Sequence, residues 1–313
     1  MRTALVTGGA GFIGSHLVEA LVKEGWKVTV VDNLATGKLS NLDGVLSKID
    51  FVEADIRDRT AMEKVCEGVE VVFHEAALAS VPRSMAEPWE TTDVNILGTL
   101  SVLEAAAHKG VRRVVAASSS SVYGNAKRYP VEEDDPLSPL SPYAASKLCN
   151  EHYLKVFNDS FGVETVALRY FNVFGPRQSP DSPYAPVIPK FISLMKEGKN
   201  PVVFGDGTQA RDFVYVENVV MANLLAADSP EAKGEVFNIS GGQPITILEL
   251  VDMLNELLDT SLKPRLAPPR PGDPKKSSAS LKKAKEILGF EIKVPFKEGL
   301  RRTVKWALRS ASG

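Results

Sequence analysis

Short apolar runs alternate with longer segments of helical period through the first 175 residues. The runs are rich in valine and have the length of buried strands. The expected strands are Thr3–Thr7, Lys27–Val31, Phe51–Glu53, Val69–Phe73, Val114–Ala117 and Val163–Leu168, and the expected helices are Phe12–Glu24, Thr60–Cys66, Trp89–Lys109 and Tyr143–Phe161. Strands buried on both faces that alternate with helices predict an α/β fold, a Rossmann-type doubly wound parallel sheet.

The pattern loosens after Gly175. Five prolines interrupt the segment from Pro176 to Pro189, and a second loop, rich in proline and basic residues, runs from Pro264 to Pro274. Between and around them we expect helices at Val187–Lys196 and Glu217–Ala227, and strands at Val202–Phe204 and Glu235–Ile239. This predicts a sheet domain at residues 1–175, with segments near 213–240 returning to it, and a smaller, mainly ligand-binding α/β domain at 176–313.

The charge balance, the lengths of the apolar runs and the cysteine spacing exclude several classes of partner. Lys and Arg number 37 against 39 Asp and Glu, a net charge of −2, whereas nucleic-acid binders normally carry a basic excess. The first apolar run, Ala4–Val6, is too short for a signal peptide, and no run approaches the roughly 20 residues of a membrane span. Cys66 and Cys149 lie far apart, outside any zinc-binding spacing. We therefore expect a cytoplasmic protein with no metal, nucleic-acid or membrane partner.

A glycine-rich segment follows the first strand and opens the first helix. Gly8, Gly11 and Gly14 allow a tight turn. Phe12 and Ile13 then provide N–H groups in the first turn of the expected helix. Such a helix end binds a pyrophosphate. Asp32 ends the second strand eighteen residues after Gly14, near the spacing of about 20 expected for an acid that binds ribose hydroxyls. Because a carboxylate repels the additional phosphate of NADP, the pattern predicts NAD.

A second chemical signal is Tyr143 followed four residues later by Lys147 on an expected helix. Residues at i and i+4 share a helix face, so the phenol and the ammonium enter the same space. A nearby cation favours the phenolate, which can then accept a proton from a sugar hydroxyl. The run Ser118–Ser121 follows an expected strand about 20 residues earlier, at the sheet edge where ligands bind. A serine there can hydrogen-bond the same hydroxyl.

These motifs together resemble the extended short-chain dehydrogenase/reductases, and the resemblance covers essentially the whole chain. Further segments resemble nucleotide-sugar 4-epimerases that use UDP-hexoses. The segments that carry the resemblance are the glycine turn, Asp32, Asp55–Ile56, His74–Ala77, Asn95, the serine run, Tyr143 with Lys147, Leu168–Pro176, Gly205–Gly207, Arg211–Phe213 and Arg270–Asp273. The resemblance implies interconversion of UDP-glucose and UDP-galactose through a transient 4-keto sugar with tightly bound NAD.

The resemblance also implies roles for individual residues. Tyr143 would be the base, Lys147 would lower its pKa and bind the nicotinamide ribose, and Ser119, with Ser120, would share the substrate hydroxyl. The implied NAD site comprises Gly8, Gly11, Phe12, Ile13, Gly14, Asp32, Asn33, Asp55, Ile56, Ala76, Ala77, Asn95, Tyr143 and Lys147. The implied UDP-sugar site comprises Ser80, Arg83, Ser119, Ser120, Tyr143, Asn172, Phe204, Arg211, Arg270, Asp273 and Ser277.

Departures from related enzymes narrow the reaction. Sugar 4,6-dehydratases carry Thr-Asp-Glu where this chain has Ser119–Ser121, and UDP-glucuronate decarboxylases carry a glutamate there, so neither reaction is expected. UDP-glucuronate 4-epimerases tend to have threonine at the position of Asn172, which favours an uncharged hexose here. Ser277 stands where similar enzymes have either tyrosine or a small residue, and we expect it to admit an N-acetyl group, which adds UDP-GlcNAc and UDP-GalNAc as substrates.

Three alternatives stay open at this point: a UDP-glucuronate 4-epimerase, a nucleotide-sugar dehydrogenase that releases NADH, and an NAD-binding regulator without catalysis. The resemblance further implies a homodimer. Its interface would be a four-helix bundle formed by the helices at Trp89–Lys109 and Tyr143–Phe161 of each copy.

Overall fold

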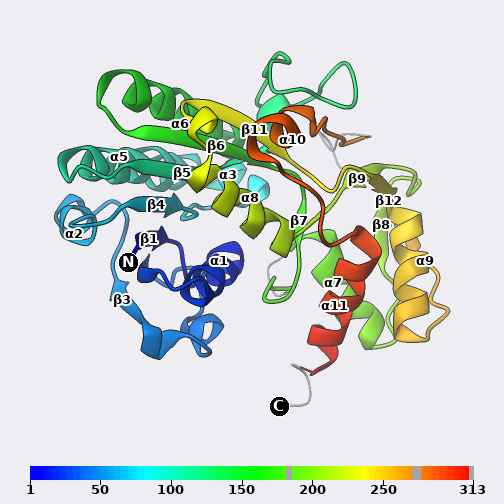
Figure 1. Ribbon diagram of the computed structural model, residues 1–313. Coiled ribbons are helices and arrows are strands. Elements are labelled where there is room, and N and C mark those ends of the chain that lie inside the picture. The colour runs from blue at the N-terminus through cyan, green and yellow to red at the C-terminus, as the bar shows by residue number, and fades with distance from the viewer. Residues whose placement is uncertain (181–184, 270–275, 310–313) are drawn as a thin grey trace.

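A seven-stranded parallel sheet forms the larger part of the molecule and confirms the predicted doubly wound fold (Figure 1). The computed structural model describes residues 1–180, 185–269 and 276–309. The strand order is β11-β6-β5-β4-β1-β2-β3. The strands are β1 (Thr3–Thr7), β2 (Lys27–Asp32), β3 (Ile49–Glu53), β4 (Val71–His74), β5 (Arg113–Ser119), β6 (Glu164–Tyr170) and β11 (Glu235–Ile239).

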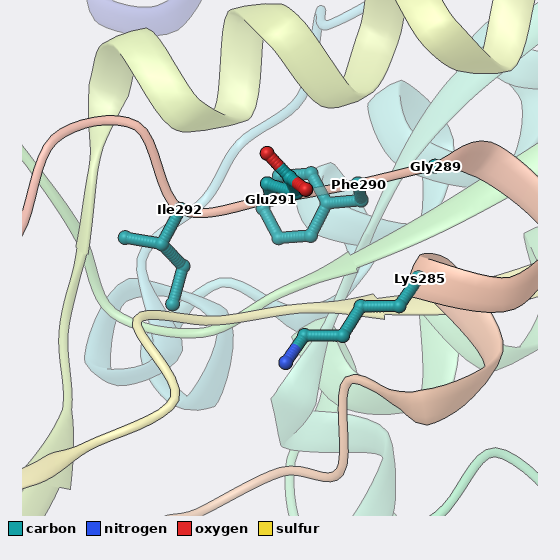
Figure 2. A pocket seen from close by; sticks show the side chains of 5 residues that line it. All are labelled: Lys285, Gly289, Phe290, Glu291 and Ile292. Atoms are coloured by element: carbon teal, nitrogen blue, oxygen red, sulfur yellow. The ribbon is translucent and has the colours of Figure 1, made fainter.

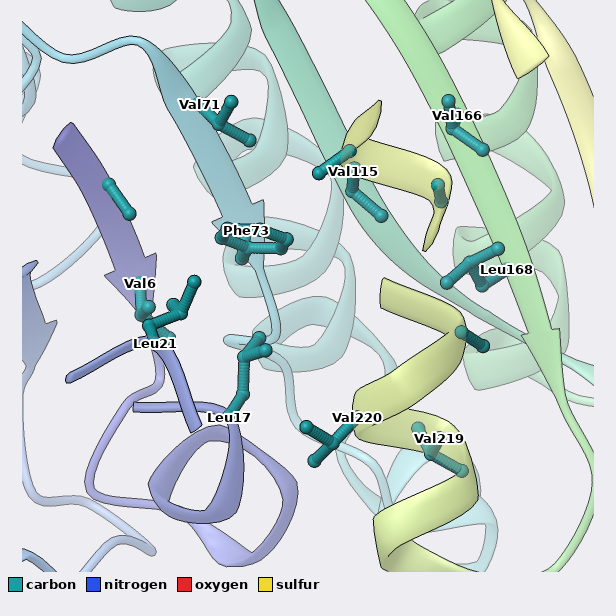
Figure 3. Close-up of a cluster of buried hydrophobic side chains, with 14 of the residues drawn as sticks. Val6, Leu17, Leu21, Val71, Phe73, Val115, Val166, Leu168, Val219 and Val220 are labelled. Atoms are coloured by element: carbon teal, nitrogen blue, oxygen red, sulfur yellow. The ribbon is translucent and has the colours of Figure 1, made fainter. Parts of the chain in front are cut away.

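Helices cover both faces of this sheet. One face packs against α1 (Phe12–Lys23) and α8 (Val216–Asp228), and the other against α2 (Arg59–Val65), α5 (Gly98–His108) and α6 (Pro142–Ser160). Figure 3 shows valines of the sheet, such as Val115 and Val166, on the same side as Leu17 of α1 and Val219 of α8. Burial on both faces explains why the strands read as continuous apolar runs in the sequence.

The segment from Pro88 to His108 is one continuous run with an irregular middle. It begins as α4 (Pro88–Thr92), passes through the π-helical turn η3 (Asp93–Leu97) and continues as α5. The sequence pattern predicts a single helix at Trp89–Lys109, which agrees in extent and lacks the π turn. A π turn widens the helix by one residue and often occurs beside functional sites. The π turn η3 contains Asn95, whose side chain is buried.

The remainder forms a smaller lobe with its own apolar core. Its helices are α7 (Val187–Lys196), α9 (Ile247–Leu258) and α11 (Phe296–Arg309). Its strand pairs are β7 (Val173–Phe174) with β10 (Val214–Tyr215), β9 (Ala210–Asp212) with β12 (Pro244–Thr246), and β8 (Val202–Phe204) with β13 (Arg265–Ala267). The helices α3 (Val81–Ala86) and α10 (Lys282–Leu288) and the 3-10 turns η1 (Leu39–Leu42), η2 (Leu46–Lys48), η4 (Ser120–Tyr123) and η5 (Pro230–Ala232) complete the described elements.

The chain crosses between the two lobes more than once. After β10, α8 returns to the large sheet, and β11 pairs with β6 at its edge. Within residues 1–180, 185–269 and 276–309, no helix combines the length and apolar character needed to cross a membrane.

A buried ion pair joins α6 to the sheet. Arg169 of β6 donates to both carboxylate oxygens of Glu151 on α6, at 2.9 and 2.7 Å, and both side chains are less than a tenth exposed. Ser118 of β5 donates to the same carboxylate at 2.5 Å, and Arg169 also donates to the Tyr123 hydroxyl at 2.7 Å. The pair therefore connects β5, β6, α6 and the turn η4.

We expect Arg169→Met to lower the free energy of unfolding by about 3–5 kcal/mol, because it leaves the Glu151 carboxylate buried without its partner. Urea unfolding followed by circular dichroism measures the change. The control is Lys155→Met, which removes an exposed pair with Asp159 on the same helix and is expected to cost at most about 1 kcal/mol. Equal urea midpoints for the two variants would contradict this account.

Candidate active site

The turn between β1 and α1 leaves no room for side chains. Gly8 has φ +68°, and a Cβ there would lie 2.7 Å from the Ala76 nitrogen. A Cβ on Gly14 would lie 2.2 Å from the Gly8 oxygen. In the described chain no side chain caps α1 at Gly11, so the N–H groups of its first turn, those of Phe12 and Ile13, can donate to an anion.

Asp32 lies at the carboxyl end of β2, next to this turn. Its Oδ2 accepts a hydrogen bond from the Ala10 nitrogen at 3.0 Å, and its Oδ1 accepts one from the Leu34 nitrogen at 2.8 Å. These bonds fix the carboxylate in place while each oxygen retains a second lone pair. Burial raises the pKa of Asp32, and the two N–H donors oppose that rise.

Asn33 and Asp55 meet at the ends of β2 and β3. The Asn33 amide donates to Asp55 Oδ2 at 2.9 Å. The Arg57 guanidinium also binds Asp55, at 2.8 and 2.9 Å, and lowers the pKa of that carboxyl to about 2. Asp55 is therefore a fixed anion. Ile56 is buried beside Gly98, where a Cβ would lie 2.5 Å from Ile56 Cδ1.

The glycine turn, the uncapped helix end and the fixed acid at β2 together fit a dinucleotide. The glycines permit close approach of the backbone to a pyrophosphate, and Asp32 provides acceptors for ribose hydroxyls. The residues present thus match the needs of NAD.

Tyr143 and Lys147 lie one turn apart near the start of α6, at the carboxyl edge of the sheet. Burial raises the pKa of Tyr143, and the nearby hydroxyl of Ser119, the last residue of β5, opposes this rise. The ionised carboxylate of Glu75 raises it further. Lys147 is buried, and its Nζ donates to the Ala117 oxygen of β5 at 2.8 Å. The base and the serine predicted from sequence are thus brought together.

Burial lowers the pKa of Lys147 to about 8, against the opposing charges of Glu75 and Glu151. From the sequence we expect the Lys147 ammonium to lower the pKa of Tyr143. In the structure, burial raises the pKa of Tyr143, Ser119 lowers it and Glu75 raises it.

Asn95 anchors the loop that follows β4. Its Oδ1 accepts from the Leu78 nitrogen at 2.8 Å, and its Nδ2 donates to the Leu78 oxygen at 3.2 Å and to Ser146 Oγ at 3.0 Å. These bonds fix Ala76 and Ala77, which precede Leu78, between the glycine turn and α6. Asn95 lies in the π turn η3.

Two predicted substrate residues lie on or beside α3. Ser80 caps this helix by accepting a hydrogen bond from the Arg83 nitrogen at 3.2 Å. Arg83 forms ion pairs with Glu87 and Glu90, each at 2.8 Å. Both residues therefore have structural partners in α3 or in the adjoining α4.

Asn172 and Ser277 are neighbours although 105 positions separate them. Asn172 adopts φ +33°, and its Nδ2 donates to the Asp212 oxygen at 2.9 Å and lies 3.4 Å from Ser277 Oγ. The Ser277 nitrogen donates to the Ala210 oxygen at 3.0 Å. The two residues that the sequence assigns to sugar recognition are thus brought together.

Buried Asp212 holds the backbone around this pair. Its carboxylate accepts hydrogen bonds from the nitrogens of Gly241, at 2.8 Å, and Ala279, at 3.3 Å. Burial raises the pKa of Asp212 to about 6, and these donors oppose the rise. The carboxylate therefore links β9, the loop after β11 and the segment that carries Ser277.

The remaining predicted substrate residues that the structure describes lie in the smaller lobe or at the sheet edge. Phe204 ends β8, where its oxygen accepts from the Gln209 amide at 2.6 Å, and Arg211 lies in β9 beside Asp212. Ser120 opens the turn η4 directly after Ser119. Arg270 and Asp273 lie outside the described residues.

Glu75 and Tyr170, which had no predicted role, lie at the carboxyl edge of the large sheet. Glu75 Oε1 accepts from the Tyr170 hydroxyl at 2.8 Å, and burial raises the pKa of Glu75 to about 7. A carboxylate directly after a buried parallel strand was the signal that could have identified Glu75.

A separate pocket of about 320 Å³ lies beyond α10, lined by Lys285 and residues 289–292 (Figure 2). None of these residues belongs to the predicted site, and α10 packs on β11 and α8. The pocket contributes nothing to the chemistry of Tyr143.

Comparison with known proteins supplies the family. Residues 4–240 match the NAD dependent epimerase/dehydratase family. A UDP-N-acetylglucosamine 4-epimerase from Methanobrevibacter ruminantium, solved with UDP-N-acetylmuramic acid, has a TM-score of 0.95 at 42% identity and covers 99% of each chain. A UDP-glucose 4-epimerase from Thermotoga maritima, solved with UDP-glucose, has a TM-score of 0.95 at 41% identity, covering 99% of this chain and 100% of that one. A UDP-glucuronate 4-epimerase of Thermodesulfobacterium geofontis is 37% identical, covering 97% of this chain and 95% of its own. The chain belongs to the NAD dependent epimerase/dehydratase family.

Proposed function

We propose that this protein is a UDP-hexose 4-epimerase that interconverts UDP-glucose with UDP-galactose and UDP-GlcNAc with UDP-GalNAc. The proposal rests on Ser119, at the end of β5, lying beside Tyr143, and on Lys147, one turn further along α6 and held on the Ala117 oxygen. A proton acceptor next to a hydroxyl donor at the carboxyl edge of a parallel sheet suits removal of a sugar proton. The relatives that act on UDP-sugars support the same reaction.

The residues of this chain handle the proton. Tyr143 accepts the proton of the C4 hydroxyl, and Ser119 orients both groups. Lys147, held on the Ala117 oxygen, supplies a positive charge at the edge of the sheet. NAD, when bound, would supply the acceptor and then the donor of the C4 hydride. Tyr143 gives its proton back to the C4 oxygen when the opposite face of the sugar is reduced.

Positions 119–121 are all serine, so this stretch offers no acid to expel a water molecule from the sugar. This supports epimerisation over dehydration. The NAD-binding residues of our proposal are those of the glycine turn, the ends of β2 and β3, and the Ala76–Ala77 loop, with Asn95 behind it.

We expect Tyr143→Phe to lower kcat by about 10²–10⁴-fold, because the variant keeps the ring and loses the proton acceptor. Chromatographic separation of UDP-glucose and UDP-galactose measures turnover. Calorimetry with UDP serves as the folding control and is expected to give an unchanged dissociation constant. Turnover equal to that of the original protein would refute the assignment of Tyr143.

The proposed choice of sugar depends on Ser277. Asn172 and Asp212 fix the backbone around this small, half-buried side chain. A serine leaves a volume that a tyrosine would fill, and an N-acetyl group needs such a volume.

Ser277→Tyr is therefore expected to abolish turnover of UDP-GlcNAc and to retain turnover of UDP-glucose. Ser277→Ala, which keeps the volume, serves as the matched control and is expected to turn over both. The same chromatographic assay, run with UDP-glucuronate, tests the glucuronate alternative. Accumulation of NADH, measured at 340 nm, tests the dehydrogenase alternative. Equal losses on both sugars in Ser277→Tyr would exclude the size argument.

We also propose a homodimer through the face formed by α4, η3 and α6. Trp89 is 87% exposed, and Leu97, Val156 and Phe161 are about half exposed on the same group of helices. The helix α4 packs against α6. Large apolar side chains exposed on neighbouring helices in this way suit a protein interface.

Trp89→Ser combined with Leu97→Ser is expected to convert a dimer of about twice 33.9 kDa into a monomer in size-exclusion chromatography with light scattering. The control is Leu266→Ser, which removes a similarly exposed apolar side chain from β13 in the smaller lobe. A monomer before any substitution would overturn the proposed dimer.

A further inference from the structure

Glu75 occupies a fixed position at the carboxyl edge of the sheet. It directly follows β4, while Tyr170 ends β6, and β5 lies between these two strands. The hydrogen bond of 2.8 Å between the Tyr170 hydroxyl and Glu75 Oε1 thus spans the end of β5. The Asn223 amide of α8 donates to the same hydroxyl at 2.8 Å. The carboxylate is therefore held by Tyr170 of β6, whose hydroxyl is in turn held by Asn223 of α8.

The charge of Glu75 is less neutralised than that of the other carboxylate near Lys147. Glu151 has both oxygens on the Arg169 guanidinium. Glu75 receives its side-chain hydrogen bond from a neutral phenol, and within the described residues no arginine pairs with it. When ionised, Glu75 is thus the carboxylate whose field acts most directly on the proposed proton-transfer groups.

The groups that face Glu75 come from several elements. On β5, Ala116 pairs with His74 and Ser119 pairs with Tyr170, so Glu75 emerges beside Ala117, whose oxygen holds Lys147 of α6. Tyr143 precedes Lys147 by one turn of α6, β6 contributes Tyr170, and α8 contributes the neutral Asn223. His74, the preceding residue, is buried and hydrogen-bonded to threonine hydroxyls, with a pKa lowered to about 3 by burial and by Lys147, and so it is neutral. The charges that respond to Glu75 are therefore those of Tyr143 and Lys147.

We propose that Glu75 is a positioning residue whose negative charge sets the ionisation of Tyr143 and Lys147 together. The charge disfavours the Tyr143 phenolate and favours the Lys147 ammonium, so its removal moves the pKa of both groups downward. Its importance for turnover rests on the proposed function, whereas its effect on Tyr143 does not.

Glu75→Gln is the first test, because the amide oxygen can still accept from Tyr170 while the charge is lost. The phenolate absorbance at 295 nm is titrated in the protein as purified. The signal of Tyr143 is isolated by subtracting the titration of a matched protein that also carries Tyr143→Phe. We expect the pKa of Tyr143 to fall by about one unit in Glu75→Gln. Glu75→Leu removes both the charge and the acceptor and is expected to give the same fall.

The control is Glu24→Gln, which makes the same change in net charge at an exposed position after α1. It is expected to leave the titration of Tyr143 unchanged. An unshifted Tyr143 in both Glu75 variants, or an equal shift in Glu24→Gln, would overturn the proposal.

The second readout is the pH dependence of kcat. Since Tyr143 must accept a proton while Lys147 stays charged, both limbs of a bell-shaped profile are expected to move to lower pH in Glu75→Gln. A profile reduced in height at an unchanged pH would assign Glu75 a structural role only and contradict the proposal. A shifted titration in a protein without epimerase activity would reject the proposed function and leave the coupling of Glu75 to Tyr143 standing.

Discussion

The docking of α6 on the ends of β5 and β6 is the constraint on which the candidate site depends. The helix is fixed at successive turns: Lys147 on the Ala117 oxygen, Asn150 on Thr99, and Glu151 on Arg169 and Ser118. Each contact satisfies a polar group that is removed from water, so each would leave a costly unpaired group if the helix moved. The position of the Tyr143 phenol beside Ser119 follows from these contacts. In this arrangement, structural bonds along the helix determine the geometry of the reacting groups.

Burial then determines the electrostatics. The same removal from water that strengthens these contacts raises the pKa of Tyr143 and Glu75 and lowers that of Lys147 to about 8. Burial thereby moves the pKa values of Glu75 and Lys147 toward the range in which small changes of field alter their charge, and moves the pKa of Tyr143 away from it. The proposed sugar site is built differently, from segments that Asp212 and Asn172 hold together. This contrast suits a reaction in which the proton acceptor stays fixed while the sugar must present both faces.

Much of the larger lobe could be predicted from the sequence because its signals are local. The valine-rich runs, the glycine turn and the spacing to Asp32 each depend on a few neighbouring residues. In the smaller lobe the sequence pattern predicted α7 and β8 with their observed bounds. The helices α9 and α11 were not predicted, although Thr246 and Glu249 form a capping box at the start of α9. The proximity of Ser277 to Asn172 and of Glu75 to Tyr170 depends on how distant segments fold together. The resemblance to a family suggested the first of these pairs, and the coordinates were needed for the second.

The central claim is that one site oxidises and reduces the same sugar carbon with Tyr143 as the proton acceptor. It is tested most directly with UDP-glucose labelled with deuterium at C4, incubated in ordinary water and analysed by mass spectrometry and NMR. The account predicts UDP-galactose that retains the deuterium at C4. Product in which the label has been replaced by solvent hydrogen, or a 4-keto sugar that accumulates without UDP-galactose, would contradict it.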